Sequence, residues 1–215
     1  MVRLFCVLIG YIFGLFQTGY IYGRIKGIDI REHGSGNAGT TNALRTLGTK
    51  AGVITFIGDC LKCILAVVAV RLIFSQRYSS LMPLLTVYTG LGVVLGHNFP
   101  FYLKFRGGKG IASTAGLILT LDPVLSLIAF ATFGAAVGIT KYVSLGSLLL
   151  AAEFLAGVVI YGFSGKWNLS QPQLIEMYIV TAVITAMAFC RHIRNIKSLV
   201  KGTERKIGEK SSNHK

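Results

Sequence analysis

Hydrophobic residues in this chain are gathered into long runs, which short polar segments separate. Several runs approach the roughly 20 apolar residues that a helix needs to cross a bilayer. The run at 111–139 is too long for one such helix, and Asp122-Pro123 near its middle indicates a break. We therefore predict seven transmembrane helices, at residues 4–22, 51–74, 81–96, either side of Asp122 within 111–139, 143–163 and 174–190.

Composition agrees with this pattern. The chain is 53% hydrophobic, and only 14% of its residues are charged, against roughly 25% in soluble domains. The connecting segments are too short to form a second, soluble domain. We predict an all-α integral membrane protein that forms a single domain over residues 1–215, with a loose polar tail at about 205–215.

Basic residues predict the orientation, because they accumulate in the short cytoplasmic loops of membrane proteins. Most of the 22 Lys and Arg residues fall on the side that carries residues 24–50, 104–109, 141 and 191–215. The amino terminus is therefore expected outside and the carboxyl terminus in the cytoplasm. The aromatic residues lie in the apolar runs instead of alternating with Lys and Arg, so we attribute the net charge of +14 to topology and anionic lipids, and expect no nucleic-acid binding.

The first polar segment, "GSGNAGTTN" at 34–42, begins as G-x-G-x-x-G. A dinucleotide fingerprint needs a βαβ unit, and this segment follows a membrane helix. Its glycines instead let backbone N–H groups converge on an anion, while hydroxyl and amide side chains add donors. We interpret the segment as an anion cradle, with a flexible turn as the alternative.

The second segment, "GHNFPFYLKFRGGKG" at 96–110, has the wrong spacing for a Walker A loop. Lys104, Arg106 and Lys109 nevertheless precede a helix N-terminus, where charge and helix dipole together attract phosphate. A positively charged loop that only sets topology explains the same residues equally well.

The third segment, "RHIRNIKSLVKGTE" at 191–204, predicts an amphipathic helix along the membrane surface. His192 and Asn195 would share one face of it. A surface histidine is usually only solvated. Here, however, all three segments emerge on the same side and together supply glycine cradles, fixed cations and an imidazole that titrates near neutrality.

Asp59 and Lys62 lie three residues apart in the second predicted span, where they can neutralise each other. Ionisable residues inside a membrane are candidates for a proton or ion pathway. This pair, with Glu153 in the sixth span, is little for a transporter. We favour the interpretation that these groups brace the helices beneath the polar segments.

Several kinds of enzyme site are missing from the sequence. The three aspartates are too widely separated to form the carboxylate pairs that hold magnesium. No histidine begins a His-x4-Asp pattern, and the context of Ser35 is not the G-x-S-x-G elbow. We expect metal-free chemistry on phosphates, with no metal and no cofactor.

Taken together, "DIREHGSGNAGTTNALRTLG" (29–48), "GHNFPFYLKFRGGKGIAS" (96–113) and "RHIRNIKSLVKGTE" resemble the three signature segments of the bacterial membrane glycerol-3-phosphate acyltransferases that use acyl phosphate. The resemblance implies transfer of a fatty acyl group from acyl phosphate to the 1-hydroxyl of sn-glycerol 3-phosphate. The products would be 1-acyl-glycerol 3-phosphate, or lysophosphatidate, and inorganic phosphate. The reaction would be the first acylation step of phospholipid biosynthesis and would take place at the cytoplasmic side of the bacterial cell inner membrane.

The resemblance also assigns site residues, all of which are polar or glycine. Those implied to hold glycerol 3-phosphate are Ser35, Arg45, Lys104, His192 and Asn195. Those implied to hold acyl phosphate are Gly36, Asn37, Thr41, Asn42, Gly107, Gly108 and Lys109. His192 and Asn195 would be catalytic: His192 would orient the hydroxyl or accept its proton, Asn195 would fix it by a hydrogen bond, and the donor's own phosphate is the other possible proton acceptor.

The expected partners are acyl phosphate, glycerol 3-phosphate and membrane lipids, with a functional link to the soluble enzyme that makes acyl phosphate. The protein is expected to be a monomer. The chief alternative is a small membrane transporter or channel for a phosphorylated anion, in which the same loops would form an entry vestibule. A membrane scaffold with a lipid-binding tail is a third class, but it leaves the first two segments without a purpose.

Overall fold

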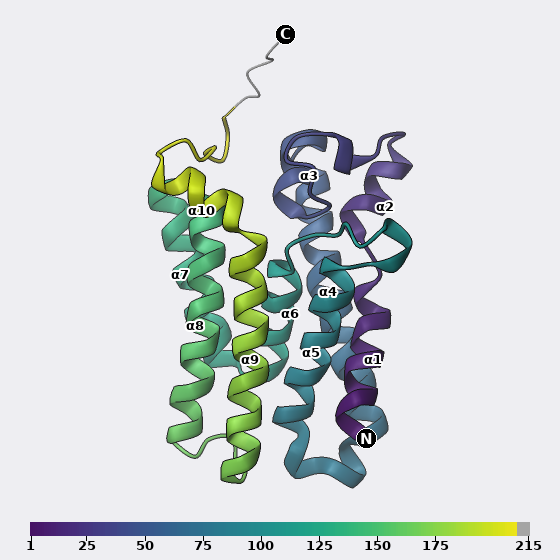
Figure 1. Cartoon of the computed structure of the whole chain (residues 1–215), viewed down its shortest axis with the longest axis vertical. Coiled ribbons are helices and arrows are strands. Elements are labelled where there is room, and N and C mark those ends of the chain that lie inside the picture. The colour runs from purple at the N-terminus through teal and green to yellow at the C-terminus, as the bar shows by residue number, and fades with distance from the viewer. Residues whose placement is uncertain (210–215) are drawn as a thin grey trace.

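The computed structural model describes residues 1–209, which form helices and no strands (Figure 1). The α-helices are α1 (Val2–Gly14), α2 (Thr18–Ile25), α3 (Thr40–Leu47), α4 (Thr49–Tyr78), α5 (Met82–Asn98), α6 (Ile111–Leu121), α7 (Pro123–Thr140), α8 (Val143–Phe163), α9 (Gln171–Arg191) and α10 (Ile193–Val200). Three short 3-10 helices cover Ile30–Glu32, Ser79–Leu81 and Phe101–Leu103.

Five helical segments within residues 1–209 are long and apolar enough to cross a membrane, and the one at Thr49–Leu103 contains both α4 and α5. The predicted break at Asp122-Pro123 is confirmed: α6 ends at Leu121, and the Asp122 carboxylate caps α7 by accepting the N–H of Leu125 at 2.8 Å. α6 has 11 residues and is about 16 Å long, less than the roughly 30 Å hydrocarbon core. The count of seven spans therefore stays a prediction.

The predicted span at residues 4–22 lies within the candidate membrane span Val2–Ile25, but it is not one unbroken helix, because the chain breaks between α1 and α2. The buried amide of Gln17 donates to the carbonyl oxygens of Gly14 at 3.2 Å, Gly96 at 3.3 Å and His97 at 3.1 Å. Two of these acceptors belong to α5. The partners that hold this break lie some 80 residues away in sequence, so local hydrophobicity gave no sign of it.

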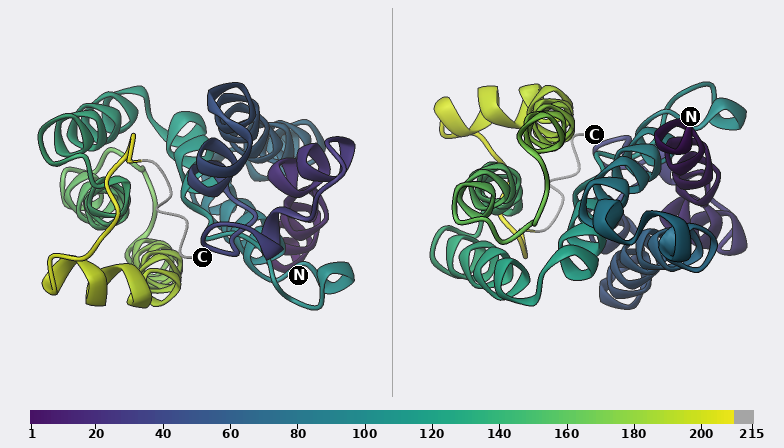
Figure 2. Two further views of the ribbon diagram at one scale, coloured as in Figure 1. Left: turned by 90° about the horizontal axis from the view of Figure 1, so that it is seen from above. Right: turned by 90° about the horizontal axis from the view of Figure 1, so that it is seen from below.

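Two groups of helices stand side by side, α1–α5 and α7–α10, with α6 between them (Figure 1 and Figure 2). Within the first group, α1 packs closely on α5 at small residues. A Cβ atom on Gly10 would lie 2.2 Å from the carbonyl oxygen of Thr89, and one on Gly92 would lie 2.2 Å from that of Val7. These glycines let the two backbones touch, as at many helix interfaces in membranes.

The polar segments gather at one end of the bundle, together with α3 and α10 (Figure 1). α10 confirms the amphipathic helix expected in the third segment, whereas α3 was not foreseen. The described part of the predicted loose tail is packed: the carbonyl of Arg205 accepts from Arg45 at 2.8 Å, and the N–H of Ile207 donates to the carbonyl of Lys141 at 2.8 Å. Residues 210–215 lie outside the described part.

Candidate functional site

A cavity of about 1050 Å³ opens at the end of the bundle that carries the polar segments. All three segments contribute to its lining. The predicted site residues that line it are Ser35, Gly36, Asn37, Thr41, Asn42, Arg45, Gly107, Lys109, His192 and Asn195. Two predicted residues, Lys104 and Gly108, are not among the lining residues. The structure thus brings most of the predicted set to one place.

Asn42 organises the first segment from within. Its side-chain oxygen accepts the N–H of Ser35 at 2.9 Å, and its amide donates to the carbonyls of Ile30 at 2.9 Å and His33 at 3.0 Å. The residue is buried, and these bonds use its whole amide group. Asn42 therefore holds the cradle together, whereas the resemblance implied that it holds substrate.

The first segment ends in the N-terminus of α3, which faces the cavity. Gly39 occupies the N-cap position, where no side chain caps the helix. The N–H groups of Thr40, Thr41 and Asn42 belong to the first turn, where a helix offers no internal acceptor. All three residues line the cavity. They give it a set of backbone donors backed by the positive end of the helix dipole.

The glycines of the second segment are arranged differently. The N–H of Gly107 donates to the carbonyl of Asn98 at 3.2 Å, and that of Gly108 donates to the carbonyl of His97 at 3.0 Å. Their own carbonyls accept from the guanidinium of Arg191, at 3.0 Å for Gly107 and at 2.9 and 3.1 Å for Gly108. Both backbone N–H groups are therefore already engaged within the protein.

The three cations of the second segment also separate. Lys104 is exposed, has a left-handed backbone with φ of 55°, and lies outside the cavity lining. Arg106 and Lys109 line the cavity. The sequence made no distinction between Lys104 and Arg106, because both flank Phe105 in a loop with no regular period.

Lys109 is the best defined of these cations. Its ammonium donates to the side-chain oxygen of Asn195. Burial lowers the pKa of Lys109 to about 8, although the carboxylate of Glu204 opposes this change. Lys109 therefore remains mostly protonated at neutral pH and becomes neutral in mildly alkaline solution.

His192 lies where α9 ends, and it is buried in the cavity wall. Its Nδ1 lies 2.7 Å from the carbonyl oxygen of Ala188. Since a carbonyl only accepts, Nδ1 carries the hydrogen and Nε2 is left as the free acceptor. Burial, and secondly the charge of Lys109, lower the pKa of His192 to about 4, so the ring is neutral at pH 7.

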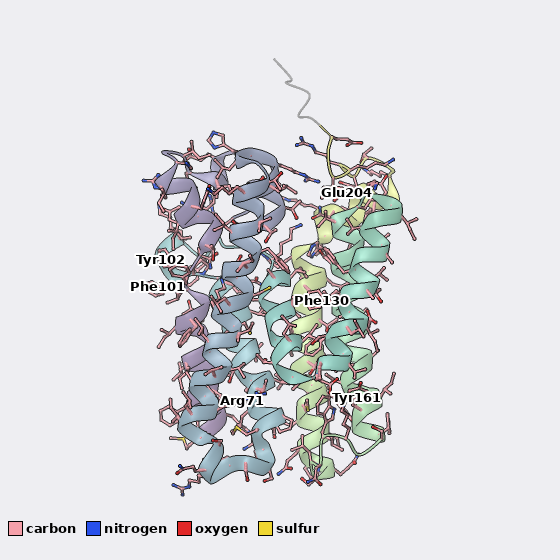
Figure 3. All side chains as sticks on the ribbon, turned by 180° about the vertical axis from the view of Figure 1, so that it is seen from behind. Arg71, Phe101, Tyr102, Phe130, Tyr161 and Glu204 are labelled. Carbon is pink, nitrogen blue, oxygen red and sulfur yellow. The ribbon has the colours of Figure 1, made fainter. Side chains whose placement is uncertain are left out.

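Glu204 completes the polar wall and was not assigned a role from the sequence. Its Oε1 accepts from the amide of Asn195 at 2.8 Å and from the hydroxyl of Ser144 at 2.7 Å. Both polar atoms of the Asn195 side chain are thus engaged, one by Lys109 and one by Glu204. Figure 3 shows Glu204 at the end of the bundle that carries the polar segments.

Arg45 projects from α3 into the same cavity. Its guanidinium donates to the carbonyl of Arg205, and within residues 1–209 it forms no ion pair with a carboxylate. Burial is the main cause that lowers its pKa from the ordinary value of 12.5. A partly buried guanidinium without a counter-ion is well suited to bind an anion.

The cavity continues as an apolar space between the two helix groups. Apolar residues from four helices line it, among them Phe56 of α4, Ile111, Ala112 and Ala115 of α6, Phe130 and Phe133 of α7, and Val143 and Leu150 of α8. Phe130 lies farther than Glu204 from the end of the bundle that carries the polar segments (Figure 3). The sequence gave no signal for these residues, because apolar positions that face lipid, core or cavity look alike.

The expected ion pair beneath the polar segments is confirmed. Lys62 Nζ lies 2.9 Å from Asp59 Oδ1, and both side chains are buried. The pair braces α4 against α2 and the break that precedes it, because Lys62 also donates to the carbonyl of Phe16 at 2.7 Å and Asp59 accepts from the hydroxyl of Thr18 at 3.1 Å. Within residues 1–209, no three His, Cys, Asp or Glu side chains are grouped so that they could hold a metal ion.

Residues 4–202 match the family model described as Glycerol-3-phosphate acyltransferase. A protein of that name from Clostridioides difficile is 43% identical over 94% of both chains. Another, from Alkaliphilus metalliredigens, is 42% identical over 99% of this chain and all of its own length.

Two crystal structures are also similar, both of PlsY (YgiH), an integral membrane glycerol 3-phosphate acyltransferase. The glycerol 3-phosphate form has a TM-score of 0.81 and 32% identity, and covers 97% of this chain and 96% of its own. The lysophosphatidic acid form has a TM-score of 0.78 and 31% identity over the same shares. The family match spans nearly the whole chain, so this protein belongs to the glycerol-3-phosphate acyltransferase family.

Proposed function

We propose that the chain transfers a fatty acyl group from acyl phosphate to the 1-hydroxyl of sn-glycerol 3-phosphate, yielding lysophosphatidate and inorganic phosphate. This reaction is the first acylation step of phospholipid biosynthesis. One observation carries the proposal: a single cavity joins a cationic end to an apolar space between α4, α6, α7 and α8. The two substrates together carry two phosphate groups, which the cationic end can bind, and one acyl chain, which the apolar space can hold.

The phosphate of the donor is assigned to the N-terminus of α3. Three backbone N–H groups there lack helical acceptors, and the side chain of Lys109 lies in the same cavity. Gly36 and Asn37 line the approach to this helix end. Gly107 and Gly108 contribute by holding the backbone of the second segment, since their N–H groups are engaged by α5.

Glycerol 3-phosphate is assigned to Arg45 together with Ser35, His192 and Asn195. Arg45 offers a planar set of donors that suits bidentate binding of phosphate. The family resemblance assigned Lys104 to glycerol 3-phosphate. We assign Arg106 in its place, because Arg106 lines the cavity and Lys104 does not. Asn195 is held by Lys109 and Glu204, and it exchanges one of these bonds when it contacts substrate.

The state of His192 indicates how the hydroxyl is used. A neutral ring with Nε2 free accepts a hydrogen bond from the 1-hydroxyl and orients it, but a group of pKa about 4 is a weak base at pH 7. Bound phosphate groups lose their second proton near a pH of about 6 and are stronger bases. We therefore assign the proton to the departing phosphate. The hydroxyl oxygen bonds to the acyl carbon as the bond from that carbon to the phosphate oxygen breaks.

We place this chemistry at the cytoplasmic face of the bacterial inner membrane, in one integral membrane domain with seven spans and the amino terminus outside. Figure 1 supports this orientation, since the amino terminus lies at the end of the bundle opposite to the polar segments, α3 and α10. The apolar part of the cavity would let the acyl chain remain among the helices. We propose that the protein acts as a monomer and that a soluble enzyme supplies the acyl phosphate.

The proposal is tested with purified protein in detergent, supplied with glycerol 3-phosphate and either an acyl phosphate or the matching acyl-CoA. Lysophosphatidate is expected from acyl phosphate alone. Product from acyl-CoA alone would refute the donor. No product from either donor, with the protein still monodisperse, would favour the transporter or channel. Arg45→Ala is the matched variant, and it is expected to raise KM for glycerol 3-phosphate about 10- to 100-fold, since hydrogen bonds to charged groups contribute roughly 1.5–3 kcal/mol.

A further inference from the structure

Beneath the cavity, the ammonium group of Lys62 joins two helices to the break between α1 and α2. Its Nζ lies 2.9 Å from Asp59 Oδ1, 2.7 Å from the carbonyl oxygen of Phe16 and 2.7 Å from His97 Nδ1. The side chains of Lys62, Asp59 and His97 are all more than nine-tenths buried. These groups have no part in the reaction described above, although Asp59 and His97 reach the cavity lining.

This arrangement fixes the state of the imidazole. An ammonium group has three hydrogens and no lone pair, so all three of its bonds point outward to acceptors. Nδ1 of His97 is therefore the unprotonated nitrogen, and the ring is neutral with its hydrogen on Nε2. Lys62 thereby sets both the tautomer and the orientation of His97.

A buried ion pair is a poor source of stability, because desolvation offsets most of the attraction. Replacing such a pair with apolar residues is often neutral or stabilising. An apolar residue at position 62, however, has no N–H group to donate to the Nδ1 of His97. The Lys62 and Asp59 pair is thus better explained by the geometry that it imposes on His97.

The ring of His97 packs against the second segment. A Cβ atom on Gly108 would lie 1.9 Å from His97 Nε2, and its three nearest neighbours would all be atoms of that ring. The backbone makes a second contact, because the carbonyl of His97 accepts the N–H of Gly108 at 3.0 Å. Gly108 is followed directly by Lys109, whose ammonium reaches Asn195.

We propose that His97, oriented by the Lys62 and Asp59 ion pair, is a positioning residue that sets the place of Gly107 and Gly108 and, through them, of Lys109 at the phosphate site. The ion pair inside the membrane thus acts on the reaction without touching a reactant. This inference depends on the proposed function only in the experiments that measure kinetics with acyl phosphate.

A double-mutant cycle tests the contact. The backbone of Gly108 has no positive φ that would strain an alanine, and the three atoms nearest to the added Cβ of Gly108→Ala all belong to the His97 ring. Residues in direct contact show non-additive effects. We expect Gly108→Ala to lower kcat/KM for acyl phosphate about 100-fold and His97→Ala about 10-fold, and the double variant to recover at least about fivefold over Gly108→Ala.

Recovery in the double variant supports the proposal, because a merely damaged fold would not be repaired by a second truncation. Strictly multiplicative losses would overturn it. Gly108→Ala alone could fail to purify as a monodisperse protein. Successful purification of the double variant would then count as the recovery, and failure of the double variant to purify would contradict the proposal.

The ion pair is tested with Asp59→Asn/Lys62→Met, which removes both charges and leaves no lone ion in the core. The expected result is a KM for acyl phosphate raised about 10-fold with kcat lowered less than about threefold, since a displaced Lys109 weakens binding of the donor. An unchanged KM would overturn the role of the pair.

A second readout separates this inference from the proposed function. The rise in Tm caused by inorganic phosphate reports the phosphate site without catalysis, and it is expected to shrink in the Asp59→Asn/Lys62→Met variant. If the natural protein makes no lysophosphatidate, the proposed function fails, and this shift still decides the inference: an undiminished rise in Tm would overturn it.

Discussion

The first and second polar segments look alike in sequence, since each combines several glycines with polar residues beside a helix start, but they work in different ways. In the first segment, the backbone presents the free N–H groups of α3 to the cavity, while the Asn42 side chain is used for support. In the second, the backbone N–H groups of Gly107 and Gly108 are used for support, and the side chain of Lys109 enters the cavity. A glycine-rich segment that borders a cavity can therefore offer its backbone N–H groups to that cavity or use them for packing within the protein.

The largest effect is expected where the support of the first segment is removed. Asn42→Ala would leave the N–H of Ser35 and the carbonyls of Ile30 and His33 without their partner. The bond to Ile30 is buried, and a buried polar group left unpaired costs about 1–3 kcal/mol. Because the part-buried bonds to Ser35 and His33 are lost as well, activity should fall at least about 100-fold and Tm should fall with it. Thermal unfolding beside the acyl transfer assay checks this. A loss of activity at an unchanged Tm would mean that Asn42 contacts substrate.

A somewhat smaller effect is expected from the side chain that carries the second segment. Lys109→Gln should raise KM for acyl phosphate about 10- to 30-fold, because it removes a charged donor worth roughly 1.5–3 kcal/mol. The pKa of Lys109 is lowered to about 8 by burial. As pH rises through about 8, the ammonium loses its proton and kcat/KM should fall in the same range.

Lys109→Arg is the matched control, because a guanidinium stays charged throughout this range. Its kcat/KM should be independent of pH between 7 and about 9.5. If kcat/KM of Lys109→Arg also fell with a midpoint near the same pH, the titrating group would be a residue other than Lys109.

A modest effect is expected from removing one backbone donor of the first segment. Proline is tolerated in the first helical turn, where its missing N–H has no internal acceptor. The extended backbone of Gly39, with ψ of 176°, suits a residue that precedes proline. Thr40→Pro should raise KM for acyl phosphate about 5- to 10-fold, as expected for one hydrogen bond to a charged group.

Thr40→Ala removes only the hydroxyl and keeps the N–H, so it should behave like the natural protein to within about twofold. Equal losses in Thr40→Pro and Thr40→Ala would show that the side chain, not the backbone, was responsible, and the contrast between the two segments would then disappear.

The smallest effect separates two cations of the second segment. Arg106→Ala should raise KM for a phosphorylated substrate a few-fold, since Arg106 lines the cavity. Lys104→Ala should change it less than about twofold, because its side chain is exposed outside the lining. Steady-state kinetics of the two variants side by side provide the measurement. A larger effect for Lys104→Ala would restore the assignment that the family resemblance implied.

Local sequence predicted most of the framework. Val143–Phe163 forms a helix with the predicted bounds, and the break before Pro123 falls where the Asp-Pro pair placed it, because hydrophobic length and proline act locally. The break at Gln17 was missed, since its partners come from α5. The use of Gly107 and Gly108 was missed for the same reason: whether a backbone N–H is free depends on which distant carbonyl reaches it.

The site residues follow the same division. Residue type and the common side of the membrane brought His192, Arg45 and Lys109 into one expected cluster, and the structure places them around one cavity. The sequence did not identify Arg191 as a support for both glycine carbonyls, or Glu204 as the partner of Asn195. Each of these contacts depends on how separate segments pack together, which local sequence patterns do not predict.

The close approach of α1 to α5 means that the first helix does more than hold the protein in the lipid. Its glycines bring the end of α1 near enough to α5 for the carbonyl of Phe16, just beyond that end, to accept a hydrogen bond from the Lys62 ammonium. A chimera in which an unrelated apolar helix of equal length replaced α1 would still insert, yet it would hold the backbones apart and withdraw that acceptor. Exchangeability of the first membrane segment is thus limited by the width of its side chains rather than by their hydrophobicity.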